Sequence, residues 1–161
     1  MRSYRALAIL AVAISWVLAN TAWLSIGDED LVGTELIQLL NLIPGISLLL
    51  IFIAGYRKLE KSLLVLSAVA MTGFVYLALT TELTSTTAAT KIYESLSGIQ
   101  GAGPADIDLP SNPSLMPWFS AAATLVAVVL TLLSALKPTE KAQIKRQEVE
   151  DNRALWDEQS D

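Results

Sequence analysis

Two glutamates, Glu35 and Glu82, are the residues of this sequence best placed to do chemistry, because each adjoins a long apolar segment. If those segments pair, the two carboxylates could approach one another and bind a cation, since hard cations prefer oxygen ligands. The chain has no cysteine and no histidine, which excludes thiolate chemistry and most transition-metal sites. No nucleophile and base accompany the glutamates. We therefore interpret them as marking the edge of water, and predict a protein that is not an enzyme and binds no cofactor or metal.

The other charged residues predict no binding site. Acidic residues cluster at Asp28-Glu29-Asp30 and at Asp106-x-Asp108, but neither cluster has the alternating spacing of a calcium loop. The net charge is −5, and no basic surface is long enough to predict nucleic-acid binding. We interpret these residues as solvated.

A second candidate is a polar site within the apolar segments, formed by Gln38, Asn41, Pro44 and Tyr76. Pro44 lacks an N–H, so the helix should kink and free a carbonyl near Leu40. Amide side chains facing lipid would be unsatisfied, so we expect them to point into the bundle. They could line a small polar binding site, or they could hydrogen-bond between helices, at about 0.6–2 kcal/mol per bond.

A third candidate is a pair of small-residue ladders. In lipid, helices associate by close packing at small residues, because burying apolar side chains against each other gains little there. These ladders could pack within the protein's own bundle or against a partner's transmembrane helix. The small residues recur four apart in the first and fourth apolar segments: Ala11, Ser15 and Ala19, and then Ala123, Ala127, Thr131 and Ala135.

A fourth candidate lies in the C-terminal tail. Residues 137–161 are highly charged, first basic and then acidic, and the acidic part surrounds the apolar pair Leu155-Trp156. Such a pair could dock a cytoplasmic protein, or the tail could be a solvated end.

The elements that must position these residues are four charge-free apolar segments. A helix needs about 20 residues to cross roughly 30 Å of hydrocarbon. We therefore predict an all-α integral membrane protein, a four-transmembrane-helix bundle over residues 1–136. The helices are expected at about 6–24, 36–56, 62–81 and 117–136, with outer loops at 25–35 and 82–116.

The basic residues predict the orientation of this bundle. With the N-terminus in the cytoplasm, all of the eleven lysines and arginines except Lys91 lie on the cytoplasmic side, as the positive-inside rule requires. Both termini are then cytoplasmic. Tyr4, Trp23, Tyr56 and Trp118 fall at the ends of the segments, where aromatic anchors are favoured. Alternatively, residues 1–19 could be a signal peptide cleaved after Ala19, which would leave three helices.

The order of these features resembles the actinobacterial tryptophan-operon-associated conserved membrane protein family. This resemblance implies a multi-pass protein of the bacterial plasma membrane, encoded near tryptophan-biosynthesis genes and without an established activity. It is carried by Thr21-Ala22-Trp23, Val32-Gly33-Thr34-Glu35-Leu36, Pro117-Trp118 and Leu155-Trp156-Asp157.

Two functions remain open from the sequence. The first is a non-enzymatic accessory or interaction protein, which contacts the lipid bilayer and a membrane or cytoplasmic protein through its helices or tail. The second is a small-solute transporter or permeability factor, for an aromatic or indole-like compound given the gene setting that the resemblance implies. The transporter requires a polar cavity around Asn41, Pro44 and Tyr76.

Overall fold

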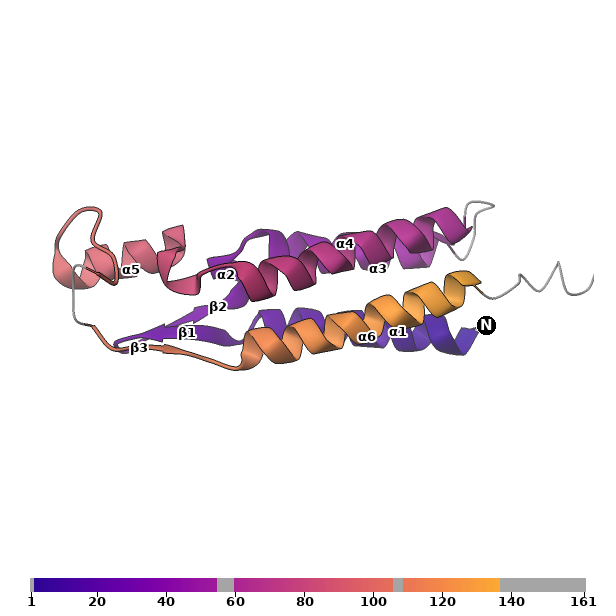
Figure 1. Ribbon diagram of the computed structural model, residues 1–161, viewed down its shortest axis with the longest axis horizontal. Coiled ribbons are helices and arrows are strands. Elements are labelled where there is room, and N and C mark those ends of the chain that lie inside the picture. The colour runs from indigo at the N-terminus through magenta and orange to yellow at the C-terminus, as the bar shows by residue number, and fades with distance from the viewer. Residues whose placement is uncertain (1, 55–59, 106–108, 137–161) are drawn as a thin grey trace, which may run out of the picture.

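The protein is mostly helical and elongated, with long helices running side by side and a smaller head at one end (Figure 1). The structure, a computed structural model, describes residues 2–54, 60–105 and 109–136. The long helices are α1 (Arg2–Ala19), α3 (Leu39–Ala54), α4 (Glu60–Thr80) and α6 (Met116–Leu136). The head contains β1 (Ala22–Ile26), β2 (Glu29–Val32), the single-turn α2 (Gly33–Leu36), a 3₁₀ turn (Leu83–Ser85), α5 (Thr87–Ser97) and β3 (Ser111–Pro113).

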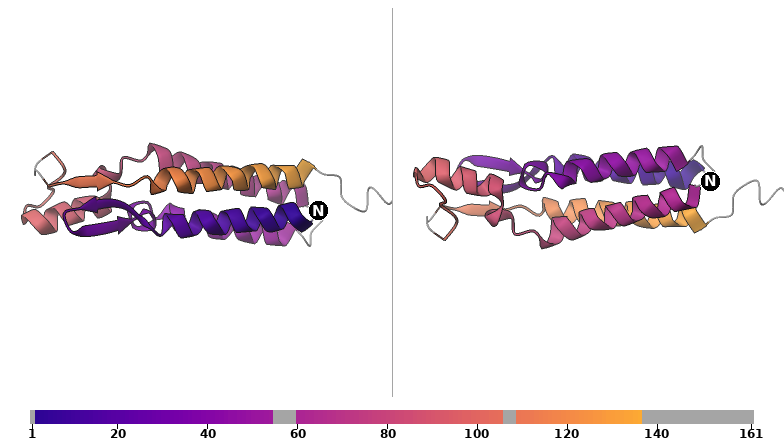
Figure 2. Two further views of the ribbon diagram at one scale, coloured as in Figure 1. Left: turned by 90° about the horizontal axis from the view of Figure 1, so that it is seen from below. Right: turned by 90° about the horizontal axis from the view of Figure 1, so that it is seen from above.

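The four long helices form a closed ring of contacts. Helix α6 packs against both α1 and α4, and α3 packs against α4 and, less extensively, against α1. Figure 2 shows all four running along nearly the same axis. The start of α1 and the end of α6 therefore lie at the same end of the bundle, opposite the head (Figure 1).

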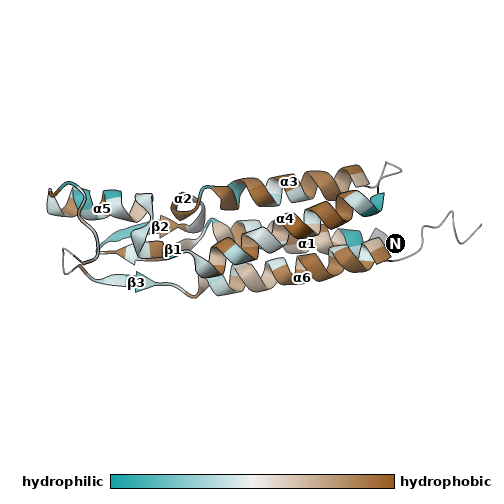
Figure 3. Cartoon of the chain, turned by 45° about the horizontal axis from the view of Figure 1, so that its top comes forward, coloured by the Kyte–Doolittle hydropathy of each residue, from teal (hydrophilic) through white to brown (hydrophobic). Residues whose placement is uncertain are grey.

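Small and hydroxyl-bearing side chains fill much of the bundle interior, whereas large apolar side chains cover its outside. Alanines and hydroxyls fill much of the interior, among them Ala8, Ala127, Ser67 and Thr131, which are at most 1% exposed. Large aliphatic side chains face outward from all four helices, and Figure 3 shows the bundle as the most hydrophobic part of the protein. Among the described residues, α4 and α6 are long and apolar enough to cross a membrane, and α1 and α3 are shorter apolar helices.

The first two expected helices end differently from the prediction. Helix α1 stops at Ala19, so the predicted range 6–24 is too long, and the chain then turns into β1. The second expected helix, 36–56, is replaced by α2 and α3. They are separated at Ile37, whose backbone is extended (φ −133°, ψ 94°). The first break has a tertiary cause, because the residues that follow α1 form β1, which pairs with β2 in the head sheet. The described ends of α4 and α6 lie within two residues of the predicted ones.

The head is built on a three-stranded antiparallel sheet in the order β2-β1-β3, so the prediction of an all-α protein is wrong for this part of the chain. Gly27 adopts φ 60° in the turn after β1, and its N–H donates to Pro110 O at 3.1 Å. The predicted outer loop 82–116 therefore contains structure of its own. Within it, Thr86 caps α5 by accepting from Ala89 N, and Gly98 ends that helix in the left-handed conformation at φ 70°.

A buried cluster joins the head to the adjoining end of the bundle. Trp23, Leu24 and Ile26 from β1 pack in it with Phe74 from α4 and Tyr93 from α5, and all five are fully buried. The prediction that Trp23 is an interfacial anchor is wrong. Its indole lies in this core, and its Nε1 donates to Leu18 O at 2.9 Å, where the end of α1 leaves carbonyls without helical partners.

Candidate functional site

The predicted polar site does not assemble inside the bundle. Gln38, Asn41 and Tyr76 are exposed, and of the four residues only Pro44 is buried. The expectation that the two amides point inward is therefore wrong. Asn41 finds a partner on the outer surface instead, where Trp16 Nε1 donates to its Oδ1 at 2.9 Å.

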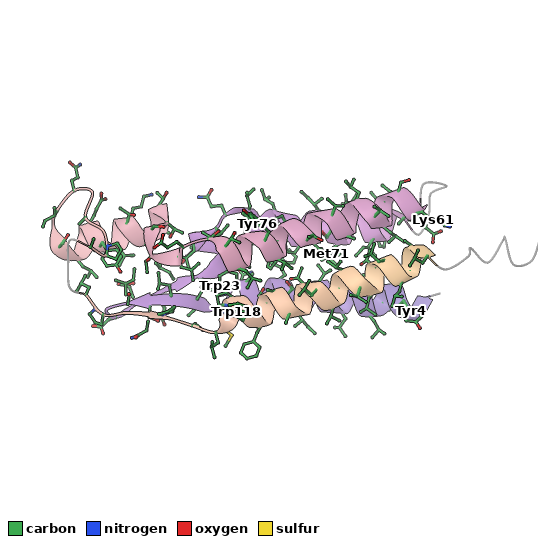
Figure 4. The ribbon with its side chains drawn as sticks, in the orientation of Figure 1. Tyr4, Trp23, Lys61, Met71, Tyr76 and Trp118 are labelled. Atoms are coloured by element: carbon green, nitrogen blue, oxygen red, sulfur yellow. The ribbon has the colours of Figure 1, made fainter. Side chains whose placement is uncertain are left out.

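These outward-facing polar and aromatic residues lie at the end of the bundle next to the head. Figure 4 shows Tyr76 on α4 and Trp118 on α6 near the head, and Tyr4 and Lys61 near the opposite end. Tyr76 and Trp118 are 67% and 64% exposed. Rings with one polar atom favour the boundary between hydrocarbon and water. Helix α4 has 21 residues, which corresponds to a length of about 30 Å, close to the hydrocarbon thickness of a bilayer.

The small-residue ladders come together within the chain. Ala11, Ser15 and Ala19 of α1 are buried, as are Ala127, Thr131 and Ala135 of α6, while Ala123 is half-buried. Helix α1 packs directly against α6. In this structure the ladders serve the protein's own bundle, which is the first of the two interpretations that the sequence left open.

A closed hydroxyl network fixes the seam between α1 and α6. Thr124 Oγ1 donates to Ser120 O at 2.8 Å, so its only proton is used there. The 2.5 Å contact between Ser15 Oγ and Thr124 Oγ1 must then have Ser15 as its donor. Ser120 Oγ in turn donates to Ser15 O at 3.1 Å. Each of the three hydroxyls donates one bond, and two of these bonds cross between the helices in the bundle interior.

The sequence did not single out several of these hydroxyls. Ser120 and Thr124 were missed because they precede and interleave with the alanine ladder on α6, and Ser47 and Ser67 because isolated serines are common in apolar helices. Ser67 Oγ donates to Ser47 O at 3.3 Å, which links α4 to α3. The Ser47 hydroxyl is itself fully buried, without a hydrogen-bond partner among the described residues.

The junction between bundle and head depends on Trp23 and Gly33. A Cβ on Gly33 would lie 2.4 Å from Trp23 Cε2 and 2.8 Å from Ala19 O, so the backbone rests directly on the indole. Gly33 N donates to Thr21 O at 3.3 Å, and Thr34 Oγ1 donates to Asn20 Oδ1 at 3.0 Å. Several of the residues that carried the family resemblance thus hold the end of α1 against the start of α2.

Both glutamates lie on the surface of the protein. Glu35 is exposed and accepts from Val32 N at 3.3 Å, which caps the start of α2. Glu82 is also exposed, ahead of the 3₁₀ turn. No group of three or more acidic, cysteine or histidine residues that could hold a metal occurs among the described residues. Asp106 and Asp108 lie outside those residues.

At the end opposite the head, Arg5 on α1 forms an ion pair with Glu60 at the start of α4. Both side chains are 21% exposed. No pattern in the sequence predicted a contact between these two helix ends. Lys61, the next residue, is exposed. The candidate docking pair Leu155-Trp156 and the rest of the tail lie outside the described residues, as does the expected anchor Tyr56.

Comparison of the chain with family models, curated proteins and solved structures gives no match. The site is therefore interpreted from its own geometry.

Proposed function

We propose that the chain is a multi-pass membrane protein whose four long helices cross the bilayer. In this arrangement the start of α1 and the end of α6 face the cytoplasm, and the head lies on the opposite side of the membrane. The observation that carries the proposal is the apolar outside of the bundle, where large aliphatic side chains are exposed on all four long helices, while hydroxyls and alanines fill much of the interior beside a few large side chains such as Ile51 and Leu64. A water-soluble bundle instead presents polar side chains outward on its exposed faces.

The apolar surface continues around the bundle. Exposed aliphatic or aromatic side chains occur on every long helix, including Val17 on α1, Phe52 on α3, Val69 on α4 and Leu136 on α6. Soluble monomers rarely expose contiguous apolar patches larger than a few hundred Å². Helices α1 and α3 are short for a full crossing. The chain bends after α1 and before α3, next to the head. These bends would then lie near the outer membrane interface, where polar partners for their backbone groups are available.

Within this membrane setting we infer a non-enzymatic accessory or interaction role. The α1 and α6 ladders are already used inside the bundle, so the surfaces left for a protein partner are the head and the charged tail. A transporter would need a polar cavity around Asn41, Pro44 and Tyr76, but Asn41 and Tyr76 face outward. The geometry therefore supports the interaction role over solute transport.

Cysteine labelling tests the membrane arrangement without background, because the chain has no cysteine. The variants are Asp28→Cys in the head, Lys61→Cys at the opposite end, and Leu125→Cys on the outward face of α6. A charged, membrane-impermeant thiol reagent applied to intact cells should label Asp28→Cys alone, and permeabilisation should expose Lys61→Cys. Leu125→Cys should stay poorly labelled in both cases, because hydrocarbon disfavours the reactive thiolate.

The matched comparison is between Asp28→Cys and Leu125→Cys, since both positions are exposed in the isolated chain. If the two are labelled equally fast, the apolar face is in water and the proposal is wrong. Labelling of Lys61→Cys in intact cells would instead reverse the orientation.

A further inference from the structure

An open groove of about 420 Å³ follows the outward face of α4 at the end opposite the head. It is lined by Lys61, Ser62, Val65, Leu66 and Val69. The two polar residues are at one end of the groove and the three aliphatic residues follow. All five are exposed in the described structure.

The charge at the polar end of this groove is positive. Glu60 is the nearest acidic residue in the sequence, and its carboxylate is paired with Arg5. Among the residues that line the groove, this pairing leaves the Lys61 ammonium as the charge at its mouth. The Ser62 hydroxyl beside it supplies a further hydrogen-bond donor.

We propose that this groove binds one anionic phospholipid of the cytoplasmic leaflet. Its phosphate contacts the Lys61 ammonium and the Ser62 hydroxyl, and an acyl chain lies along Val65, Leu66 and Val69. This inference rests on the proposed membrane arrangement, in which the Lys61 end of the bundle is cytoplasmic. The cytoplasmic leaflet is also the one that carries anionic headgroups in excess and attracts basic residues.

The dimensions of the groove fit a lipid. Val69 follows Lys61 by two helical turns, which corresponds to a rise of about 12 Å. One leaflet contributes about 15 Å of hydrocarbon. Along α4 a cationic side chain is followed by a hydroxyl and then by aliphatic side chains. This order and this length match the headgroup and the first part of an acyl chain of one phospholipid. A long ammonium side chain also reaches the headgroup level easily from this position.

The test is native mass spectrometry of the full chain, purified from vesicles of phosphatidylcholine with and without phosphatidylglycerol. The variant is Lys61→Gln, which removes the charge and keeps the length of most of the side chain. The matched control is Lys91→Gln, which changes the net charge equally but lies on α5 in the head. A groove-filling variant, Val69→Trp, tests the acyl-chain contact separately.

The parent chain and Lys91→Gln should retain phosphatidylglycerol in preference to phosphatidylcholine. Lys61→Gln should lower that preference about five-fold. Val69→Trp should reduce retention of both lipids at this site. Equal lipid retention by Lys61→Gln and Lys91→Gln would overturn the inference while leaving the membrane arrangement intact. Failure of the parent chain to enter either kind of vesicle would overturn the membrane arrangement, and this inference with it.

Discussion

Substituting Gly33 by alanine is expected to destabilise the junction between bundle and head, for steric reasons alone. Gly33 is the first residue of α2, so its backbone conformation is one that alanine adopts. The added Cβ, however, would lie 2.4 and 2.5 Å from two ring atoms of Trp23 and 2.8 Å from Ala19 O. Each of these separations is well inside van der Waals contact, so either the indole or the backbone must move.

The magnitude follows from what that movement disrupts. Trp23 is fully buried, and overpacking a filled core costs about 1–3 kcal/mol. If the indole turns away, its Nε1 also loses Leu18 O, and an unsatisfied buried donor costs about 1–3 kcal/mol. We expect a loss of about 2–4 kcal/mol in the free energy of opening the junction.

Hydrogen exchange of the full chain in detergent measures this change locally. The amides to follow are those of β1 and of Ser114, which donates to Trp23 O at 2.9 Å. Their exchange should accelerate about 30- to 700-fold if they exchange by opening of the head. The matched controls are Gly45→Ala and Gly73→Ala, where an added Cβ meets nothing within 4 Å. In these helices alanine should instead stabilise by about 0.5–1 kcal/mol.

A second background isolates the contact itself. In the Trp23→Leu variant the smaller side chain leaves room for a Cβ on residue 33, so the additional effect of Gly33→Ala should largely disappear. Two outcomes would show that packing on the indole does not explain the role of the glycine. In one, Gly33→Ala behaves like Gly73→Ala. In the other, Gly33→Ala costs as much in the Trp23→Leu background as in the parent chain.

Two further predictions concern the bundle and the tail. Ser15→Ala and Thr124→Val each break the hydroxyl network between α1 and α6. A double-mutant cycle of these two changes, measured by unfolding in mixed micelles, should give a coupling free energy of about 0.6–1.7 kcal/mol. The control is Thr72→Val, which removes a hydroxyl bonded to Ala68 O of its own helix and should show no coupling to Ser15→Ala. Deleting residues 147–161 should reduce the amount of any protein partner that co-purifies with the chain, as should alanine at both Leu155 and Trp156; an unchanged amount after both changes would exclude a docking role for the tail.

The long helices could be predicted from the sequence because the hydropathy of consecutive residues adds up along one segment. An uncharged run such as 117–136 is apolar whatever lies beside it, and its length sets how far a helix can reach. The ladder on α1 could also be predicted, since residues four apart lie on one face of any helix. The start of α4 was harder to predict, because Glu60 and Lys61 are charged. Glu60 is accommodated there by its ion pair with Arg5, which lies on another helix.

The orientation of individual side chains needed the tertiary structure. Gln38 and Asn41 were expected inside because an amide in lipid is costly, but that argument fixes only the need for a partner or for water. Trp16 supplies a hydrogen-bond partner for Asn41 on the outer surface, and Gln38 is exposed at the end of the bundle. The face of α3 that turns inward instead carries Leu40, Pro44, Ser47, Ile51 and Ala54.

The sequence by itself determined the apolar helices, the approximate ends of α4 and α6 and the concentration of basic residues near one set of helix ends, since these depend on composition along a single segment. Only the tertiary structure decided that Trp23 belongs to a buried core, that α1 stops at Ala19, and that residues 111–113 complete a sheet with residues 22–26. The physical reason is that a strand is stabilised by hydrogen bonds to its neighbours and a core by packing between distant segments. Neither contact is encoded within the segment that makes it.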